Sequence, residues 1–83
     1  MLSEGRYKIE KELGIISETR AGWSKELNLI SWNGYAAKYD LRTWGPDRNS
    51  MGKGITLTES ELRELHAIIG KELARLDAKG GVR

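Results

Sequence analysis

An Asn-Gly pair between two segments of alternating polarity limits most strongly the folds that this chain can adopt. Residues 23–32 and 37–44 each alternate apolar with polar side chains, on either side of Asn33-Gly34. A period of two residues is typical of a half-buried β-strand. Asn and Gly tolerate the positive φ angles of a tight hairpin turn. The sequence therefore predicts two antiparallel strands joined at Asn33-Gly34.

Two more strands and one helix complete the expected fold. Residues 6–17 form a first strand, in which Gly14 indicates a bulge, and residues 53–57 form a short fourth strand. Thr58 followed by Glu61 is the capping-box pattern that begins a helix. The fold class expected is α+β: a four-stranded antiparallel sheet with one face covered by one C-terminal helix (ββββα). An apolar stripe recurs at helical spacing along the helix: Leu62, Leu65, Ile69, Leu73 and Leu76.

The length and composition allow a single domain, which we expect to span residues 6–77 with frayed termini at residues 1–5 and 78–83. The chain has 83 residues, no cysteine and one histidine. A disulfide framework is therefore excluded, and the ligands of a zinc site are lacking. A chain this small usually needs a partner subunit for stability. Because one helix leaves part of the sheet uncovered, and Ile68 widens the apolar face, we expect a homodimer.

The charge of the chain is a weak indicator of its partners. The formal net charge of +2 does not by itself indicate a nucleic acid. Between residues 20 and 57, however, six basic residues stand against three acidic ones, which gives the middle of the chain a modest positive field. No segment reaches the length of a membrane span, and no apolar region follows residues 1–5 as in a signal peptide. We expect a cytoplasmic protein with no membrane association and no cofactor.

Trp32 and Trp44 are the residues with the clearest functional signal. Each ends a predicted strand, and counting along the strands places both on the face opposite the leucines, beside Lys38 and Arg42. Bases of a single-stranded nucleic acid stack on exposed rings, and its phosphates pair with such cations. The other interpretation is that the two indoles fill a dimer interface or a partial core. The sequence alone leaves both interpretations open.

Other residues give weaker signals. Lys25 and Arg48 are further candidates for phosphate contacts. Residues 51–54 resemble a fragment of a phosphate-binding loop, but Asp47 and Gly54 stand where the Walker pattern requires Gly and Ser or Thr. The glycines there serve either the close approach of a phosphate or a tight strand entry. No catalytic set of side chains can be assembled, so we do not expect an enzyme.

The chain resembles a known family along most of its length. Residues 38–44 (KYDLRTW) and 52–57 (GKGITL), with a loop between them and a helix after them, resemble the C-terminal domain of transcriptional coactivator positive cofactor four (p15). Residues 22–28, 31–33 and 44–47 are similar to its small bacterial, YdbC-like branch. The combined motif is specific, whereas Gly-Lys-Gly-Ile alone would be a weak signal.

The resemblance implies a homodimer whose curved sheets form grooves for single-stranded DNA, with the helices at the dimer interface. It implies that Trp32 and Trp44 stack on bases. The serine-rich N-terminal region of the eukaryotic members has no counterpart in this sequence, so the coactivator role does not follow. The resemblance also implies that the DNA backbone is contacted by Lys38, Arg42 and Lys53. The segments similar to the bacterial branch add three candidate site residues, Trp23, Lys25 and Asn33.

We therefore expect a protein that binds single-stranded DNA with little sequence preference, in transcription regulation or DNA maintenance. RNA is a further candidate ligand, and no small-molecule substrate is expected. The alternative function is a protein-interaction module that docks a transcription or replication partner through its exposed tryptophans. A third interpretation is a purely structural dimer with buried tryptophans.

Overall fold

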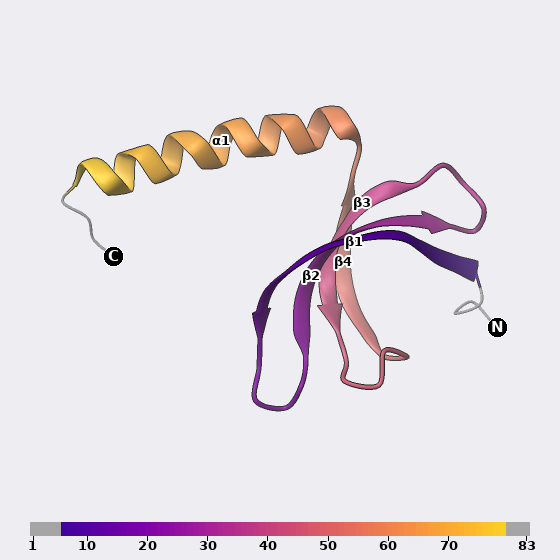
Figure 1. Ribbon diagram of the computed structural model, residues 1–83. Coiled ribbons are helices and arrows are strands. Elements are labelled where there is room, and N and C mark those ends of the chain that lie inside the picture. Colours follow the sequence, from indigo (N-terminus) through magenta and orange to yellow (C-terminus); the bar gives the residue numbers. More distant parts are fainter. Residues whose placement is uncertain (1–5, 80–83) are drawn as a thin grey trace.

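The computed structural model describes residues 6–79 and contains one antiparallel sheet followed by one helix (Figure 1). The strands lie in chain order within the sheet, so each is hydrogen-bonded to its sequence neighbours. The predicted ββββα order is confirmed. Residues 1–5 and 80–83, where frayed termini were expected, lie outside the described residues, but the helix extends through Ala78, which was expected to fray. The elements are β1 (Tyr7–Glu18), β2 (Ser24–Trp32), β3 (Lys38–Trp44), β4 (Met51–Leu57) and α1 (Glu59–Ala78).

The turn between β2 and β3 forms as the Asn-Gly signal predicts. Asn33 has a φ of 52° and Gly34 a φ of 80°. The Tyr35 N–H donates to the Trp32 carbonyl oxygen at 2.9 Å and closes the turn. Two successive positive φ angles are the pattern of a type I′ turn, whose twist matches the flanking strands.

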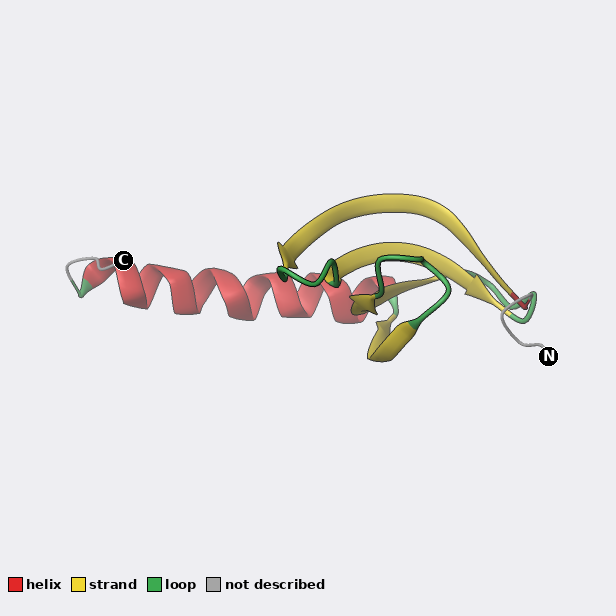
Figure 2. Ribbon diagram, turned by 90° about the horizontal axis from the view of Figure 1, so that it is seen from below, coloured by secondary structure: helices red, strands yellow, loops and turns green. Residues whose placement is uncertain are grey.

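Strand β1 is irregular, and its irregularities bend the sheet. Its register against β2 shifts three times, and one shift falls at Gly14, as predicted. Each bulge inserts a residue and increases the local bend of its strand. Figure 2 shows β1 and β2 as strongly curved strands. The shifts lie between Ile9 and Lys11, Glu12 and Gly14, and Ile15 and Ser17.

Helix α1 begins at the predicted capping box. The Glu61 N–H donates to Thr58 Oγ1 at 3.2 Å, and the Thr58 N–H donates to Glu61 Oε1 at 2.8 Å. Two of the otherwise unpaired backbone donors at the helix start are thereby satisfied. Beyond its first turns, α1 runs away from the sheet (Figures 1 and 2), and none of its described residues is buried.

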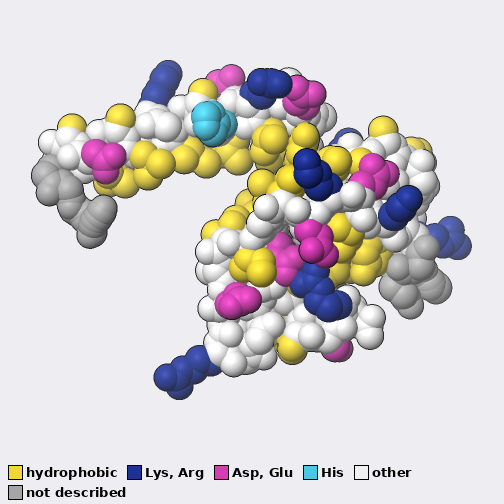
Figure 3. All heavy atoms as spheres, in the orientation of Figure 1, with side chains coloured by type: hydrophobic (Ala, Val, Ile, Leu, Met, Phe, Trp, Pro, Cys, Tyr) yellow, Lys and Arg dark blue, Asp and Glu magenta, His cyan; other side chains and the backbone are white. Residues whose placement is uncertain are grey.

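The helix was predicted to cover one face of the sheet, but it covers only part of that face. A hollow of about 820 Å³ lies between α1 and the sheet and is lined mainly by apolar side chains. The helix follows the edge strand β4 and leaves at an angle, so it contacts β3 and β4 and leaves much of this face of the sheet uncovered. Apolar side chains remain along the side of α1 that faces the sheet (Figure 3). The lining includes Leu27, Tyr39, Leu41, Leu57, Leu62 and Leu65.

Within residues 6–79, the buried side chains lie on the opposite face of the sheet. Trp44 is 1% exposed and Ile30 is fully buried, together with polar neighbours on the same strand faces. Counting along the strands placed these residues opposite the leucines, as observed, but it did not predict that their face would hold the buried residues. We call it the curled face and define it by Ser24, Glu26, Asn28 and Ile30 of β2 and Asp40 and Trp44 of β3.

Candidate nucleic-acid interface

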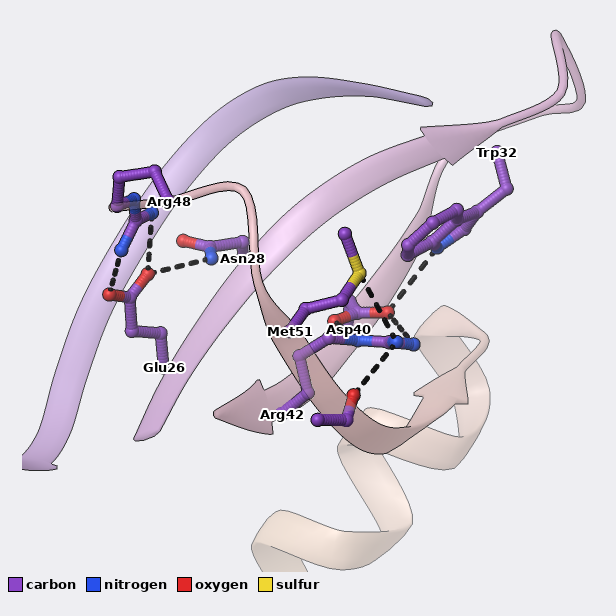
Figure 4. Close-up of polar contacts among 8 residues, drawn as sticks. Glu26, Asn28, Trp32, Asp40, Arg42, Arg48 and Met51 are labelled. Carbon is purple, nitrogen blue, oxygen red and sulfur yellow. Dashed lines mark hydrogen bonds and ion pairs between the residues drawn. The ribbon is translucent and has the colours of Figure 1, made fainter. Parts of the chain in front are cut away.

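One buried carboxylate on the curled face holds an arginine against an indole. The carboxylate of Asp40, which is fully buried, accepts from Arg42 Nε at 2.7 Å and from Arg42 Nη2 at 2.8 Å. The Trp32 Nε1–H also donates to Asp40, at 3.3 Å, and the Arg42 guanidinium lies 4.7 Å from the Trp32 ring centroid. Figure 4 shows the three side chains in contact. We call Asp40, Arg42 and Trp32 the Asp40 cluster.

A second buried carboxylate repeats this arrangement. The side chain of Glu26 accepts from Arg48 Nη1 at 2.5 Å and from Arg48 Nη2 at 3.1 Å (Figure 4). The Arg48 guanidinium lies 5.0 Å from the ring centroid of Trp44. We call Glu26, Arg48 and Trp44 the Glu26 cluster. In both clusters a bidentate ion pair and a cation–π contact share one guanidinium, which combines two interactions suited to arginine.

The surroundings of Glu26 favour its charged form. The hydrogen bond from Arg48 lowers the pKa of Glu26 from 4.5 to about 2, against the opposing effect of burial, and hydrogen bonds from Ser24 and Asn28 lower it further. The same ion pair raises the pKa of Arg48. Both groups are therefore charged at neutral pH, which a buried pair needs if it is to offset its desolvation.

The free energy of unfolding is expected to fall in acid because of Glu26. A folded-state pKa below the unfolded value gives a stabilisation that is complete above about pH 4.5 and is lost as the pH falls toward about 2. The lowering of the Glu26 pKa corresponds to a contribution of about 3 kcal/mol to the free energy of unfolding. This contribution is measured by urea unfolding, followed by circular dichroism at several pH values, for the wild type and for Glu26→Gln. The difference between the two proteins should shrink with acid, and a difference independent of pH would contradict the assignment.

Tyr7 joins the two clusters and was not predicted as a site residue. Its ring centroid lies 5.3 Å from that of Trp32 and 5.7 Å from that of Trp44. Trp32 and Trp44 align with opposite ends of β2, which a straight strand would separate by roughly 26 Å. One ring reaches both indoles because the sheet bends toward this face. The signal available in the sequence was the cross-strand position of Tyr7 opposite Trp32, which the three bulges of β1 conceal.

The glycines of β4 serve the packing of Arg42. Arg42 Nη1 donates to the Gly52 carbonyl oxygen at 3.4 Å, so its side chain lies across β4. A Cβ atom at Gly54 would collide with Arg42 Cβ and would lie 2.5 Å from the Leu41 carbonyl oxygen. Strand β4 begins at Met51, two residues before the predicted start. Its glycines allow β3 and β4 to approach closely. Of the two interpretations of residues 51–54, the geometry favours the packing role.

Two of the predicted contacts, Trp44 and Arg42, are largely shielded from solvent. The sequence left open whether the Trp44 ring is exposed or buried, and the structure shows it buried, with Arg48 and Tyr7 against it and 1% of the residue exposed. Trp32 is half-buried. Arg42 was expected to contact phosphates, but its side chain is only 15% exposed and points to Asp40.

The remaining predicted site residues lie at the surface or near it. Lys38 follows the turn and pairs in register with Ile30, which places it on the curled face two residues from Asp40. Lys25 alternates with Glu26 and so belongs to the side of the sheet that faces α1. Within residues 6–79, none of the ion pairs formed includes a lysine. Lys25, Asn33, Lys38 and Lys53 are exposed, and Trp23 is half-buried.

Two kinds of feature are absent from the described part of the chain, a cluster of metal ligands and a membrane-spanning helix. Within residues 6–79, His, Asp and Glu side chains nowhere gather in a group of three or more that could hold a metal ion. The helix of this region, α1, lacks the combination of length and apolar character needed to cross a membrane.

Comparison with known families decides the classification. A family model described as Transcriptional Coactivator p15 (PC4) matches residues 19–68. This match covers more than half of the chain and includes β2, β3, β4 and the first half of α1. The chain belongs to the p15 family. The p15 family is known for single-stranded DNA binding and transcriptional coactivation, and it is a family of non-enzymatic, nucleic-acid-binding proteins.

A bacterial relative extends the match. A protein of Treponema pallidum (strain Nichols) described as uncharacterized is 46% identical over 63 residues, which cover 76% of this chain and 74% of the relative. The p15 assignment therefore agrees with the resemblance seen in the sequence.

Proposed function

We propose that this p15 family member binds single-stranded DNA with little sequence preference through the curled face of its sheet. The observation that carries the proposal is the pairing of an accessible indole with a cation on one face. Trp32 is partly exposed at the end of β2, and the exposed Lys38 begins the neighbouring strand on the same face. A base stacked on such a ring contributes about 1–3 kcal/mol, and the lysine is within reach of the adjacent phosphates.

The Asp40 cluster supports this role by holding Trp32 in place. Its indole nitrogen is bonded to a buried carboxylate, and Tyr7 packs on the ring at a tilt of 39°. A ring that is already fixed loses little conformational entropy when a base stacks on it. Arg42 contributes here as the partner of Asp40 and of the Trp32 ring.

We further propose that the functional unit is a homodimer formed through α1. The hollow beside the sheet and the exposed apolar residues of α1 form one continuous apolar region that a second copy would cover. Exposed apolar patches rimmed by polar residues commonly mark such interfaces. The exposed fractions are 56% for Ile68, 45% for Ile69, 52% for Leu73 and 42% for Leu76.

Titration of tryptophan fluorescence with oligo-dT tests the proposed DNA binding. Strong quenching by the single strand, weaker quenching by a duplex of equal length, and a log affinity that falls by about 0.7 per phosphate contact for each unit of log salt are expected. Lys38→Ala should weaken binding and make this salt dependence less steep. Lys71→Ala, on the polar side of α1, removes the same charge and should change neither.

Absence of quenching at low salt by folded protein would refute the DNA-binding proposal. Oligo-U of the same length, measured in parallel, decides whether RNA is also accepted. A strong preference for one base composition would refute the expected tolerance of sequence, because stacking on indoles distinguishes bases only weakly.

A further inference from the structure

Trp44 has no ring face to which a base could bind in the described conformation. The Arg48 guanidinium lies 5.0 Å from the ring centroid, and the Tyr7 ring lies 5.7 Å away at a tilt of 50°. Only 1% of the residue is exposed. Stacking requires an open ring face, so a base can reach Trp44 only after one of these covers moves.

Arg48 is the less firmly held of the two covers. Its side chain is 44% exposed and borders a hollow of about 420 Å³ beside Glu26 and Asn28. Tyr7 pairs in register with Trp32 and packs on both indoles, so moving it would separate two aromatic contacts and disturb the β1–β2 ladder. Moving Arg48 separates one ion pair and one cation–π contact.

The loop that carries Arg48 allows the side chain to move while the backbone stays. The Asp47 carboxylate accepts from the Asn49 N–H at 2.9 Å and from the Ser50 N–H at 3.1 Å. The hydrogen bond from Ser50, with that from Asn49, lowers the pKa of Asp47. The Arg48 N–H donates to the Gly45 carbonyl oxygen at 3.0 Å. The turn is thus fixed by bonds that do not involve the Arg48 side chain.

Departure of Arg48 would leave the Glu26 carboxylate without its counter-ion but still hydrogen-bonded. Glu26 keeps the hydrogen bonds from the Ser24 hydroxyl at 2.5 Å and from Asn28 Nδ2 at 3.2 Å. In addition, the Trp44 Nε1–H is buried and has no acceptor within the described part of the chain, whereas that of Trp32 donates to Asp40. An unpaired buried donor is unfavourable, and an oxygen atom of a bound strand can satisfy it.

We propose that Arg48 is a displaceable cover of Trp44, a positioning residue that closes the ring in the free protein and leaves it when a strand binds. This inference rests on the DNA-binding function proposed above. A base takes the place of the guanidinium on the indole. The guanidinium exchanges the Glu26 carboxylate for a phosphate of the same strand, since both anions suit its bidentate geometry. The second tryptophan thereby becomes available only to a ligand that carries both a base and a phosphate.

Glu26→Gln tests the cover, because it keeps the shape of the side chain and removes the charge that holds Arg48. Glu64→Gln, at an exposed position of α1, removes the same charge and is the matched control. In the free protein, solvent exchange of the Trp44 indole N–H, measured by NMR, should be about tenfold faster in Glu26→Gln and unchanged in Glu64→Gln. Glu26→Gln should bind a labelled oligo-dT about tenfold more tightly than Glu64→Gln. This is the ratio expected if Arg48 covers the ring in about nine-tenths of the molecules of free Glu64→Gln and in few molecules of Glu26→Gln.

Equal exchange and equal affinity in the two variants would overturn the proposal, as would weaker binding by folded Glu26→Gln. If Glu26→Gln does not fold, Arg48→Lys replaces it, because lysine keeps the charge but lacks the planar fork and should also open the ring. Wild-type protein that binds no oligo-dT refutes the proposed function itself and, with it, the role of the cover in binding. In that case the indole exchange still reports whether Arg48 covers the ring, so the two failures are distinguishable.

Discussion

Replacing Asp40 with alanine is expected to lower the free energy of unfolding by about 3–5 kcal/mol, which is the cost of removing one partner from a buried ion pair. Asp40 is fully buried, and its loss leaves the Arg42 guanidinium, only 15% exposed, without its carboxylate. The Trp32 Nε1–H loses its acceptor as well. Domains of this size are stable by only about 4–12 kcal/mol, so the loss is a large share of the total stability. Urea unfolding followed by circular dichroism measures the loss.

The pair between Glu59 and Arg63 is the matched control for Asp40. Its nitrogen and oxygen atoms are 2.7 Å apart, as in the pair between Arg42 and Asp40, but its side chains are 66% and 77% exposed. Glu59→Ala should therefore cost less than about 1 kcal/mol. Replacing Asp40 and Arg42 together by leucine and methionine should recover part of the loss, since no buried charge remains unpaired. Equal losses for Asp40→Ala and Glu59→Ala would show that burial does not set the strength of the pair.

Replacing Leu73 with glutamate is expected to convert the proposed homodimer into a monomer. Leu73 is 52% exposed on the apolar side of α1, and burial of a leucine side chain contributes about 1.5–3 kcal/mol. A two-fold symmetric interface contains the residue twice, so the loss is about 3–6 kcal/mol. This corresponds to an increase of the dimer dissociation constant by about 10²–10⁴-fold. Sedimentation velocity over a range of protein concentrations measures the change.

Lys71→Gln provides the control for Leu73→Glu. It changes the net charge by the same amount, and helical spacing places Lys71 on the side of α1 opposite the apolar stripe. We expect Lys71→Gln to remain dimeric. If both variants dissociate to the same degree, the loss of the dimer is due to the change in net charge. If the wild type is monomeric at high protein concentration, the proposed interface is refuted.

Local signals in the sequence predicted the elements of the fold correctly. The turn at Asn33-Gly34 and the capping box of Thr58 and Glu61 depend on residues close together in the chain, and both form as expected. The alternation of β2 and β3 also predicted which residues share a face. These features need no knowledge of the rest of the molecule, which is why the sequence suffices for them.

The sequence could not predict which face of the sheet would be buried. Burial of Trp44 depends on Arg48, which lies on a loop, and on Tyr7, which lies on a strand with three register shifts. A count of alternating positions fails at every bulge, because each extra residue reverses the side to which later side chains point. The bidentate pairing of Glu26 with Arg48 joins residues 22 positions apart, a distance at which local patterns carry no information.

The repeated combination of carboxylate, arginine and indole was visible only in the folded chain. Trp32, Arg42 and Trp44 were predicted as ligand contacts, and the structure gives Arg42 a second role as the partner of Asp40. The lysines at 25, 38 and 53 need no such arrangement, since an exposed cation on a strand is accessible wherever the strand lies. Exposure of a lysine could therefore be predicted from the sequence, whereas the surroundings of the aromatic residues could not.

Because none of the described residues of α1 is buried within one copy, we expect the order of the helix to depend on the protein concentration. Within one copy, α1 is stabilised by its capping box and by the exposed pairs of Glu59 with Arg63 and Glu72 with Arg75. Such local terms make an isolated helix of 20 residues only marginally stable. Amide hydrogens of α1 should thus exchange faster as the solution is diluted, while those of β2 and β3 remain protected. In the proposed homodimer, the order of the helix therefore depends on the protein concentration.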